Sequence, residues 1–189
     1  MDMDMDMEQD HVKAVPLPLD SRITSTYPLV NFADAYSLEL PAGASTNPEQ
    51  LARFIFSQLS PWMTALMKIR DALAAGFGLK TIKHLSSLGE DANASRVGFF
   101  KIYSTDQTEI VLGEGDKHLD FRLSLLCSSQ SAPNEKRRLT LSTVVRCHNR
   151  LGRLYILLIA PFHRLIVRSI LGRAARAGWP PARMTGALN

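Results

Sequence analysis

The sequence predicts an α+β fold in which one strand and two helices precede an antiparallel sheet, and a long helix ends the domain. Two observations lead to this prediction. From Val97 onward, apolar and polar residues alternate with a period of two between short polar turns, a pattern typical of consecutive antiparallel strands. After Cys147 the period becomes that of a helix and continues to Ala177.

The N-terminal 20 residues have the composition of a tail. Acidic residues alternate with methionine over residues 1–7, and Pro16 and Pro18 follow. We therefore expect residues 1–20 to be a disordered acidic tail, residues 21–178 to form the domain, and residues 179–189 to be a flexible C-terminal tail.

The sequence also favours a cytoplasmic protein. The acidic N-terminus lacks the basic and apolar regions of a signal peptide. Cys127 and Cys147 are not spaced as metal ligands, so we expect reduced, buried thiols.

The first elements are predicted from their end signals. A strand is expected over Asp34–Leu40, because Pro41 and Gly43 follow it. Asn47 before Pro48 predicts the start of a short helix. Ser60 before Pro61 predicts a second helix, which the glycines at positions 76 and 78 would end.

The sheet and the terminal helix complete the domain. The expected strands are Val97–Ser104, Glu109–Gly113, His118–Cys127 and Leu139–Cys147. Asn149 is expected to cap a helix over Arg150–Ala177, which Pro161 would kink. At about 100° per residue, one broad apolar face is expected to cover the sheet: Leu151, Leu154, Tyr155, Leu158, Phe162, Leu165 and Ile166.

Charge is divided unevenly along the chain. Residues 136–189 contain eleven basic and no acidic side chains, whereas residues 1–135 contain 11 basic and 18 acidic ones. This division predicts an acidic partner for the C-terminal end, such as anionic lipid headgroups contacted by Arg153, Arg164 and Arg168. It equally fits a basic helix lying on the acidic body of its own domain.

The sequence of the terminal helix disfavours a membrane-spanning segment. Its uncharged run, Leu154–Phe162, is less than half of the ~20 residues that a spanning helix needs. Attachment at a membrane surface stays open. The basic residues lack interleaved aromatic residues, so no specific nucleic-acid binding is expected.

Three stretches together resemble a bacterial family of unknown function, DUF2867, over about Phe32 to Arg173: Pro61-Trp62 with Leu66-Met67-x-x-Arg70, Gly113-Glu114-x-x-x-His118-Leu119-Asp120-Phe121-Arg122, and His148–Arg164. That family is similar to the START/Bet v 1-like (SRPBCC) superfamily, whose helix-grip fold wraps a curved antiparallel sheet around a long C-terminal helix. The resemblance implies a small hydrophobic ligand in a cavity between sheet and helix. It implies no catalytic residues. Some members look fused to a dinucleotide-binding domain, but no G-x-G-x-x-G follows a strand here, so no cofactor is expected.

The strand over His118–Cys127 supplies candidate ligand-binding residues. Alternation places His118, Asp120 and Arg122 on its polar face. If that face lines the cavity, Asp120 and Arg122 orient a polar headgroup, and the terminal helix adds Tyr155 and Phe162. The alternative is a solvated face with an Asp–Arg ion pair.

An enzyme using His118, Asp120 and Arg122 in the cavity is a third hypothesis. Neither G-x-S-x-G nor a P-loop pattern occurs to support a hydrolase or a kinase. No metal site is expected, because the acidic residues near His118 lack a second motif with ligands. His148 is expected to end a strand and His163 to be a hydrogen-bonded structural residue. The sequence leaves the oligomeric state open.

Overall fold

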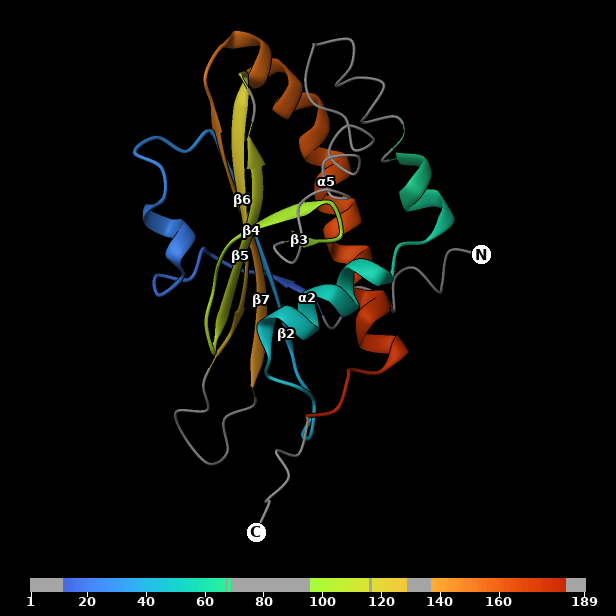
Figure 1. Cartoon of the computed structure of the whole chain (residues 1–189). Helices are drawn as coiled ribbons and strands as arrows, with labels where there is room; N and C mark the ends of the chain where they lie inside the picture. The colour runs from blue at the N-terminus through green and yellow to red at the C-terminus, as the bar shows by residue number, and fades with distance from the viewer. Residues whose placement is uncertain (1–11, 67, 69–95, 116, 129–136, 183–189) are drawn as a thin grey trace.

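The computed structural model describes residues 12–66, 68, 96–115, 117–128 and 137–182. Within these residues, seven strands form one antiparallel sheet in the order β1-β2-β7-β6-β5-β4-β3 (Figure 1). The strands are β1 Lys13–Ala14, β2 Phe32–Glu39, β3 Arg96–Val97, β4 Phe100–Thr105, β5 Glu109–Gly115, β6 Leu119–Cys127 and β7 Arg138–Cys147. The predicted α+β class and the antiparallel pairing are confirmed.

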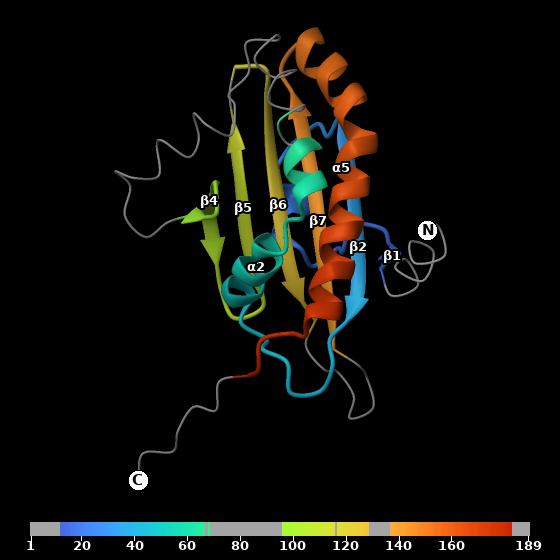
Figure 2. The same cartoon turned by 90° about the vertical axis from the view of Figure 1, so that its right-hand side faces the viewer.

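Helices cover one face of the sheet. The long helix α5, Arg150–Ala177, runs along the sheet, and α2, Pro48–Ser57, lies beside it together with the helical segment 61–66 (Figure 2). A short 3₁₀ helix, η1, Arg22–Ser25, lies on the opposite face (Figure 1). The expected continuation of the second helix to residues 76 and 78 lies outside the described residues.

Two of the three predicted helix caps, those of Asn47 and Asn149, are confirmed, whereas the buried Ser60 hydroxyl makes no capping bond within the described residues. The Asn47 side chain accepts a hydrogen bond from the Gln50 amide at 2.9 Å, with Pro48 at the first helical position. The Asn149 side chain accepts one from the Gly152 amide at 3.0 Å. These bonds satisfy backbone donors that have no partner inside the helix, so they fix where α2 and α5 begin.

Two boundaries in the structure differ from the predicted ones. Gly98 has a φ of +58° and turns the chain between β3 and β4, so the single strand expected over Val97–Ser104 is a hairpin. At the N-terminus, Val12 is buried, and Lys13 and Ala14 pair with Ser37 and Tyr36. Residues 12–15, expected in the tail, therefore pack on or pair with the edge of the sheet.

The start of the expected C-terminal tail also packs on the domain. The Ser45 amide donates to the Pro180 carbonyl at 2.7 Å, and the Ala182 amide donates to the Gly43 carbonyl at 2.8 Å. The Trp179 ring lies 5.8 Å from the Phe54 ring. Residues 179–182 thus belong to the fold, whereas residues 183–189 lie outside the described part.

The main core lies between the sheet and the helices α2 and α5. Its most deeply buried side chains come from both layers: Leu51, Ile55, Met63, Ile110, Leu112, Leu139 and Leu171. A smaller cluster on the opposite face packs Ile23 of η1 against Val111 and Val144. The sheet is therefore covered on both faces over part of its area.

The face of α5 that packs on the sheet differs from the predicted one. Tyr155 is buried as expected, but Leu151, Leu154, Leu158, Phe162 and Leu165 are exposed. The residues buried along α5 are instead Gly152, Tyr155, Val167, Ile170, Leu171, Gly172 and Ala174. The reason lies at the first turn, where a Cβ atom on Gly152 would collide with the His118 carbonyl oxygen. The helix therefore approaches the sheet through a residue that carries no apolar side chain.

Both cysteines are free and buried, as predicted. Burial raises the pKa of the Cys127 thiol to about 12 and also raises that of Cys147. Because the thiolate is the reactive form, we expect a disulfide reagent such as DTNB to label neither thiol of the folded protein at pH 8. Both should react once the chain is denatured. Rapid labelling of the folded protein would contradict the burial of these side chains.

Candidate functional site

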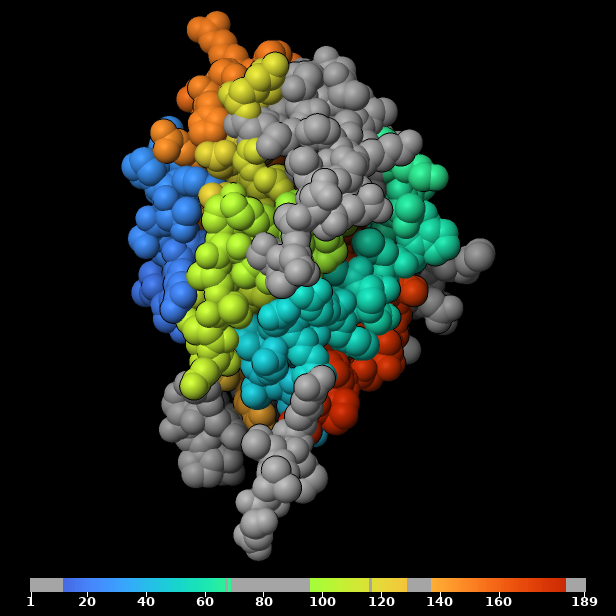
Figure 3. Space-filling view, viewed as in Figure 1, coloured from blue at the N-terminus to red at the C-terminus, as the bar shows by residue number. Residues whose placement is uncertain are grey.

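A groove lies where α5, the helical segment 61–66 and the β1–β2 end of the sheet meet. Its volume is about 520 Å³, which is within the range of small-molecule sites. The lining residues come from four separate parts of the chain: Val12, Tyr36, Trp62, Met63, Pro161, Arg164, Leu165, Arg168, Ser169 and Arg173. In Figure 3, α2 and the segment 61–66 lie against α5 beside this region.

The position of Trp62 follows from the start of its helical segment. Ser60 begins that segment, and its carbonyl accepts the Thr64 amide at 3.0 Å. Met63 is fully buried in the core, whereas its neighbour Trp62 is 41% exposed. Anchoring through Met63 therefore directs the indole of Trp62 to the wall of the groove.

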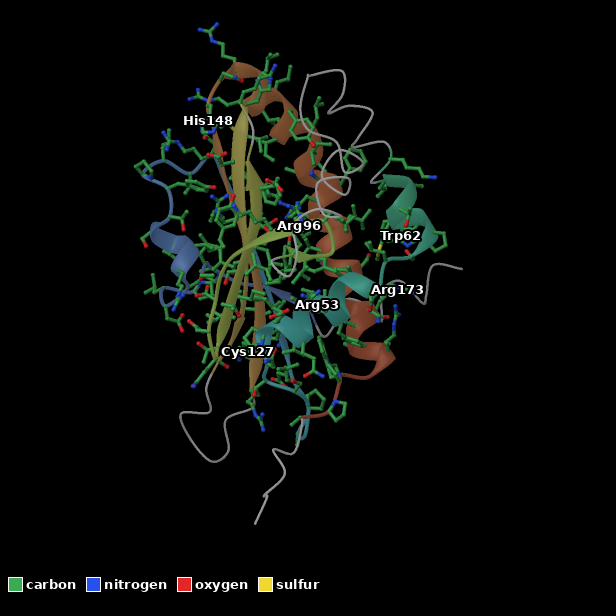
Figure 4. The ribbon with its side chains drawn as sticks, in the orientation of Figure 1. Arg53, Trp62, Arg96, Cys127, His148 and Arg173 are labelled. Atoms are coloured by element: carbon green, nitrogen blue, oxygen red, sulfur yellow. The ribbon has the colours of Figure 1, made fainter. Side chains whose placement is uncertain are left out.

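The opposite wall is formed by α5 around Pro161. The helix continues through this proline, which cannot donate a backbone hydrogen bond. Arg173 is held near α2, because its Nε donates to the Gln58 carbonyl at 2.9 Å. Figure 4 shows Trp62 and Arg173 on the same side of the molecule, away from His148.

The charge of the groove is basic. Three guanidinium groups, those of Arg164, Arg168 and Arg173, line it, and none of its described lining residues is acidic. The remaining lining is largely apolar and aromatic. Burial raises the pKa of the Tyr36 phenol, and the nearby Asp34 adds to this rise, whereas Arg164 and Arg168 oppose it. An apolar groove with arginines suits a ligand that combines an apolar body with an anionic group.

A polar cluster lies between α5 and the sheet, next to Tyr36. His163 Nε2 is 3.3 Å from Asp34 Oδ1 on β2 and 3.2 Å from Thr143 Oγ1 on β7. The ring of Phe32 packs edge-on against the His163 ring at 5.6 Å. The expectation that His163 is a hydrogen-bonded structural residue is confirmed.

The five residues predicted to bind a ligand are not brought together. In β6, Phe121, Leu123 and Leu125 face the core beneath the helices. Asp120 and Arg122 therefore lie on the opposite face, because successive residues of a strand point to opposite sides. Tyr155 is buried against Leu119, Val145 and Cys147, and Phe162 is exposed on α5. The described residues therefore do not gather around one cavity, and the ligand-binding and catalytic roles expected for them stay predictions.

Arg122 has a structural environment on that opposite face. Gly113 of the neighbouring strand has no side chain to block it, since a Cβ there would crowd the Arg122 Cδ. The guanidinium lies 3.5 Å from the ring centre of Tyr103 and 5.7 Å from that of Tyr27. Burial raises the pKa of Tyr27 to about 12, although Arg122 acts in the other direction. Arg122 thus joins β4 to the segment that follows η1 by cation–π contacts.

Asp120 and His118 have partners that the sequence did not predict. Asp120 Oδ2 is 3.0 Å from His148 Nε2, and both side chains are partly exposed. His118 is buried, and its Nδ1 is 2.9 Å from the side-chain Nδ2 of Asn149. These contacts join the start of β6 to the junction between β7 and α5. Among the described residues, no three His, Cys, Asp or Glu side chains gather closely enough to hold a metal ion.

Sequence reasoning missed most of the groove. Arg164 and Arg168 were predicted to contact anionic lipid headgroups and not to line a groove, and Val12 was placed in a tail. One available signal was the spacing of Arg164, Arg168 and Leu165, which puts all three near one side of α5. The contribution of Trp62 and Tyr36 depends on tertiary contacts that no local pattern reports.

Comparison with known proteins gives one match. A family model described as "Protein of unknown function (DUF2867)" matches residues 26–170. No curated protein and no solved structure matches the chain.

Proposed function

The chain belongs to the DUF2867 family, whose description names no activity, and we propose from its groove that the domain binds a small amphipathic ligand with an anionic end group. The apolar part of the ligand would lie against Trp62, Leu165 and Pro161. Its anionic end would meet Arg164, Arg168 and Arg173. This proposal includes the helix-grip assignment, which the long C-terminal helix lying along an antiparallel sheet supports.

The groove carries the proposal because it combines size, apolar lining and one sign of charge. Hydrogen bonds from arginine to a carboxylate or phosphate are charge-assisted and often bidentate. An apolar wall alone would accept many ligands, whereas the arginines select those with an anionic group. Asp34, the acidic side chain near Tyr36, is paired with His163.

A single-tryptophan protein provides the test. The chain contains two tryptophans, so Trp179→Phe leaves Trp62 in the groove as the only indole reporter. We expect a long-chain fatty acid to change Trp62 emission with saturation, and the alcohol of equal chain length to bind about tenfold more weakly. Arg164→Gln combined with Arg168→Gln should weaken fatty-acid binding by at least tenfold.

The matched control is Arg150→Gln combined with Arg153→Gln. These two arginines lie on the same helix, and their replacement removes the same charge, but neither of them lines the groove. The control should bind the fatty acid as the parent protein does. No saturable binding of either probe, or an equal loss in both double variants, would contradict ligand binding at this groove.

A further inference from the structure

The first half of α5 presents a row of large apolar side chains to solvent. Six of them are between 41% and 72% exposed, and together they are called the leucine face: Leu151, Leu154, Leu157, Leu158, Phe162 and Leu165. Single exposed leucines are ordinary on protein surfaces, but a contiguous row on one helix is not. Such a row marks a surface that has a partner.

The burial of α5 is too low for an ordinary core helix. By length and composition alone α5 is apolar enough to cross a membrane. A helix in the core of a soluble domain can be equally apolar, but it is mostly buried. Only 28% of the most apolar 18-residue stretch of α5 is buried in the domain. Much of the apolar surface of α5 is therefore not used by packing on the sheet.

The packing of α5 decides how this surface would meet a partner. Tyr155, Val167 and Ile170 hold the helix along the sheet, and His163 contacts Asp34 and Thr143. A helix fixed in this way lies with its exposed face parallel to a surface and does not cross it. That geometry is the geometry of an interfacial helix.

The charges beside the leucine face point to the chemistry of the partner. Arg150, Arg153, Arg164 and Arg168 lie on α5, and the helix contains no acidic residue from its first position to its last. Trp62 is exposed near Leu165, since both line the same groove. Leucine and tryptophan side chains beside arginines fit the boundary between acyl chains and anionic headgroups. A nucleic acid would use the arginines and leave the leucines in water.

We propose that the leucine face of α5 docks the domain on the surface of an anionic lipid bilayer. The apolar side chains enter the interfacial layer, and the arginines lie among the headgroups. This docking does not depend on a ligand in the groove. If both hold, the mouth of the groove at Leu165 and Trp62 faces the lipid.

Vesicle sedimentation with paired variants tests the docking. The probes are phosphatidylcholine vesicles with and without phosphatidylglycerol. We expect the protein to sediment with the anionic vesicles, and the bound fraction to fall as NaCl rises from about 0.1 M to about 1 M, which shortens the Debye length from about 10 Å to about 3 Å. Leu154→Glu combined with Leu158→Glu should weaken binding by more than tenfold, because two apolar contacts are lost and two negative charges gained.

The control is Leu19→Glu combined with Leu29→Glu, which adds the same charge at exposed leucines outside α5. It should retain most of the binding, and both double variants should unfold at the same temperature as the parent, because all four side chains are exposed. Binding that is equal in the two variants overturns the proposal. Failure of the parent protein to bind anionic vesicles also overturns the proposal. If light scattering then shows a dimer that the Leu154→Glu and Leu158→Glu variant dissociates, the leucine face pairs with a second copy of the chain instead.

Discussion

Replacing Glu109 by alanine is expected to lower the free energy of unfolding by about 3 kcal/mol or more. The Glu109 carboxylate is 3% exposed and accepts hydrogen bonds from the hydroxyls of Ser21 and Ser124 and from the Arg22 amide. Alanine removes the acceptor and leaves these donors buried or half-buried without it. Chemical denaturation monitored by circular dichroism measures the change.

The same substitution should release η1 from the sheet. Glu109 of β5 holds the start of η1 through the Arg22 amide. The ion pair between the Arg22 side chain and Glu109 contributes little, because the Arg22 side chain is half exposed. Trypsin should therefore cleave after Arg22 faster in Glu109→Ala than in the parent. Glu49→Ala serves as the control, because Glu49 pairs with Arg53 on the surface of α2 and should cost less than about 1 kcal/mol. Equal stability losses in the two variants would contradict an anchoring role for Glu109.

Replacing Gly152 by alanine is expected to destabilise the domain by about 2 kcal/mol. Helix propensity alone predicts the opposite sign, since alanine in a helix is favoured over glycine by roughly 1 kcal/mol. The contact decides the outcome, because the added Cβ would meet the His118 carbonyl oxygen, a backbone atom that cannot rotate away. The start of α5 must then move from the sheet, and Tyr155 loses packing against Leu119 and Val145.

Arg153→Ala is the matched control for this prediction. Arg153 is the next residue of α5 and is exposed, so its replacement should change stability by less than about 0.5 kcal/mol. Thermal unfolding of both variants compares the two effects. A Gly152→Ala protein as stable as the parent would show that the approach of helix to sheet at this point is not tight.

The sequence predicts the elements of this fold better than their faces. Asn47 and Asn149 each bond the amide of the residue three positions further along the chain, so the starts of α2 and α5 follow from local chemistry. The buried side of α5 does not follow, because Gly152 carries no side chain for a hydrophobic pattern to count. Its role depends on His118, a residue distant in sequence but adjacent in the fold.

The candidate site was predicted less well for a related reason. Alternation in β6 separates Asp120 and Arg122 from Phe121 and Leu123, but it does not tell which set faces the helices. The pairing of Glu109 with Ser21 joins residues 88 positions apart, and no local pattern reports such a contact. The groove likewise gathers residues from both ends of the chain, with Val12 at one side and Arg173 at the other.

The two-residue strand β1 has a consequence for the solubility of the protein. The outermost strand of a sheet exposes backbone groups that can pair with another chain. Lys13 and Ala14 pair with those backbone groups of β2, and the Val15 amide donates to the Ala35 carbonyl. Pro16 has no N–H with which a strand of another chain could pair. Because Val12 also lines the groove, a bound ligand would hold this cover in place by mass action. Loss of the ligand would then expose the edge of β2 and promote its association with other copies of the chain.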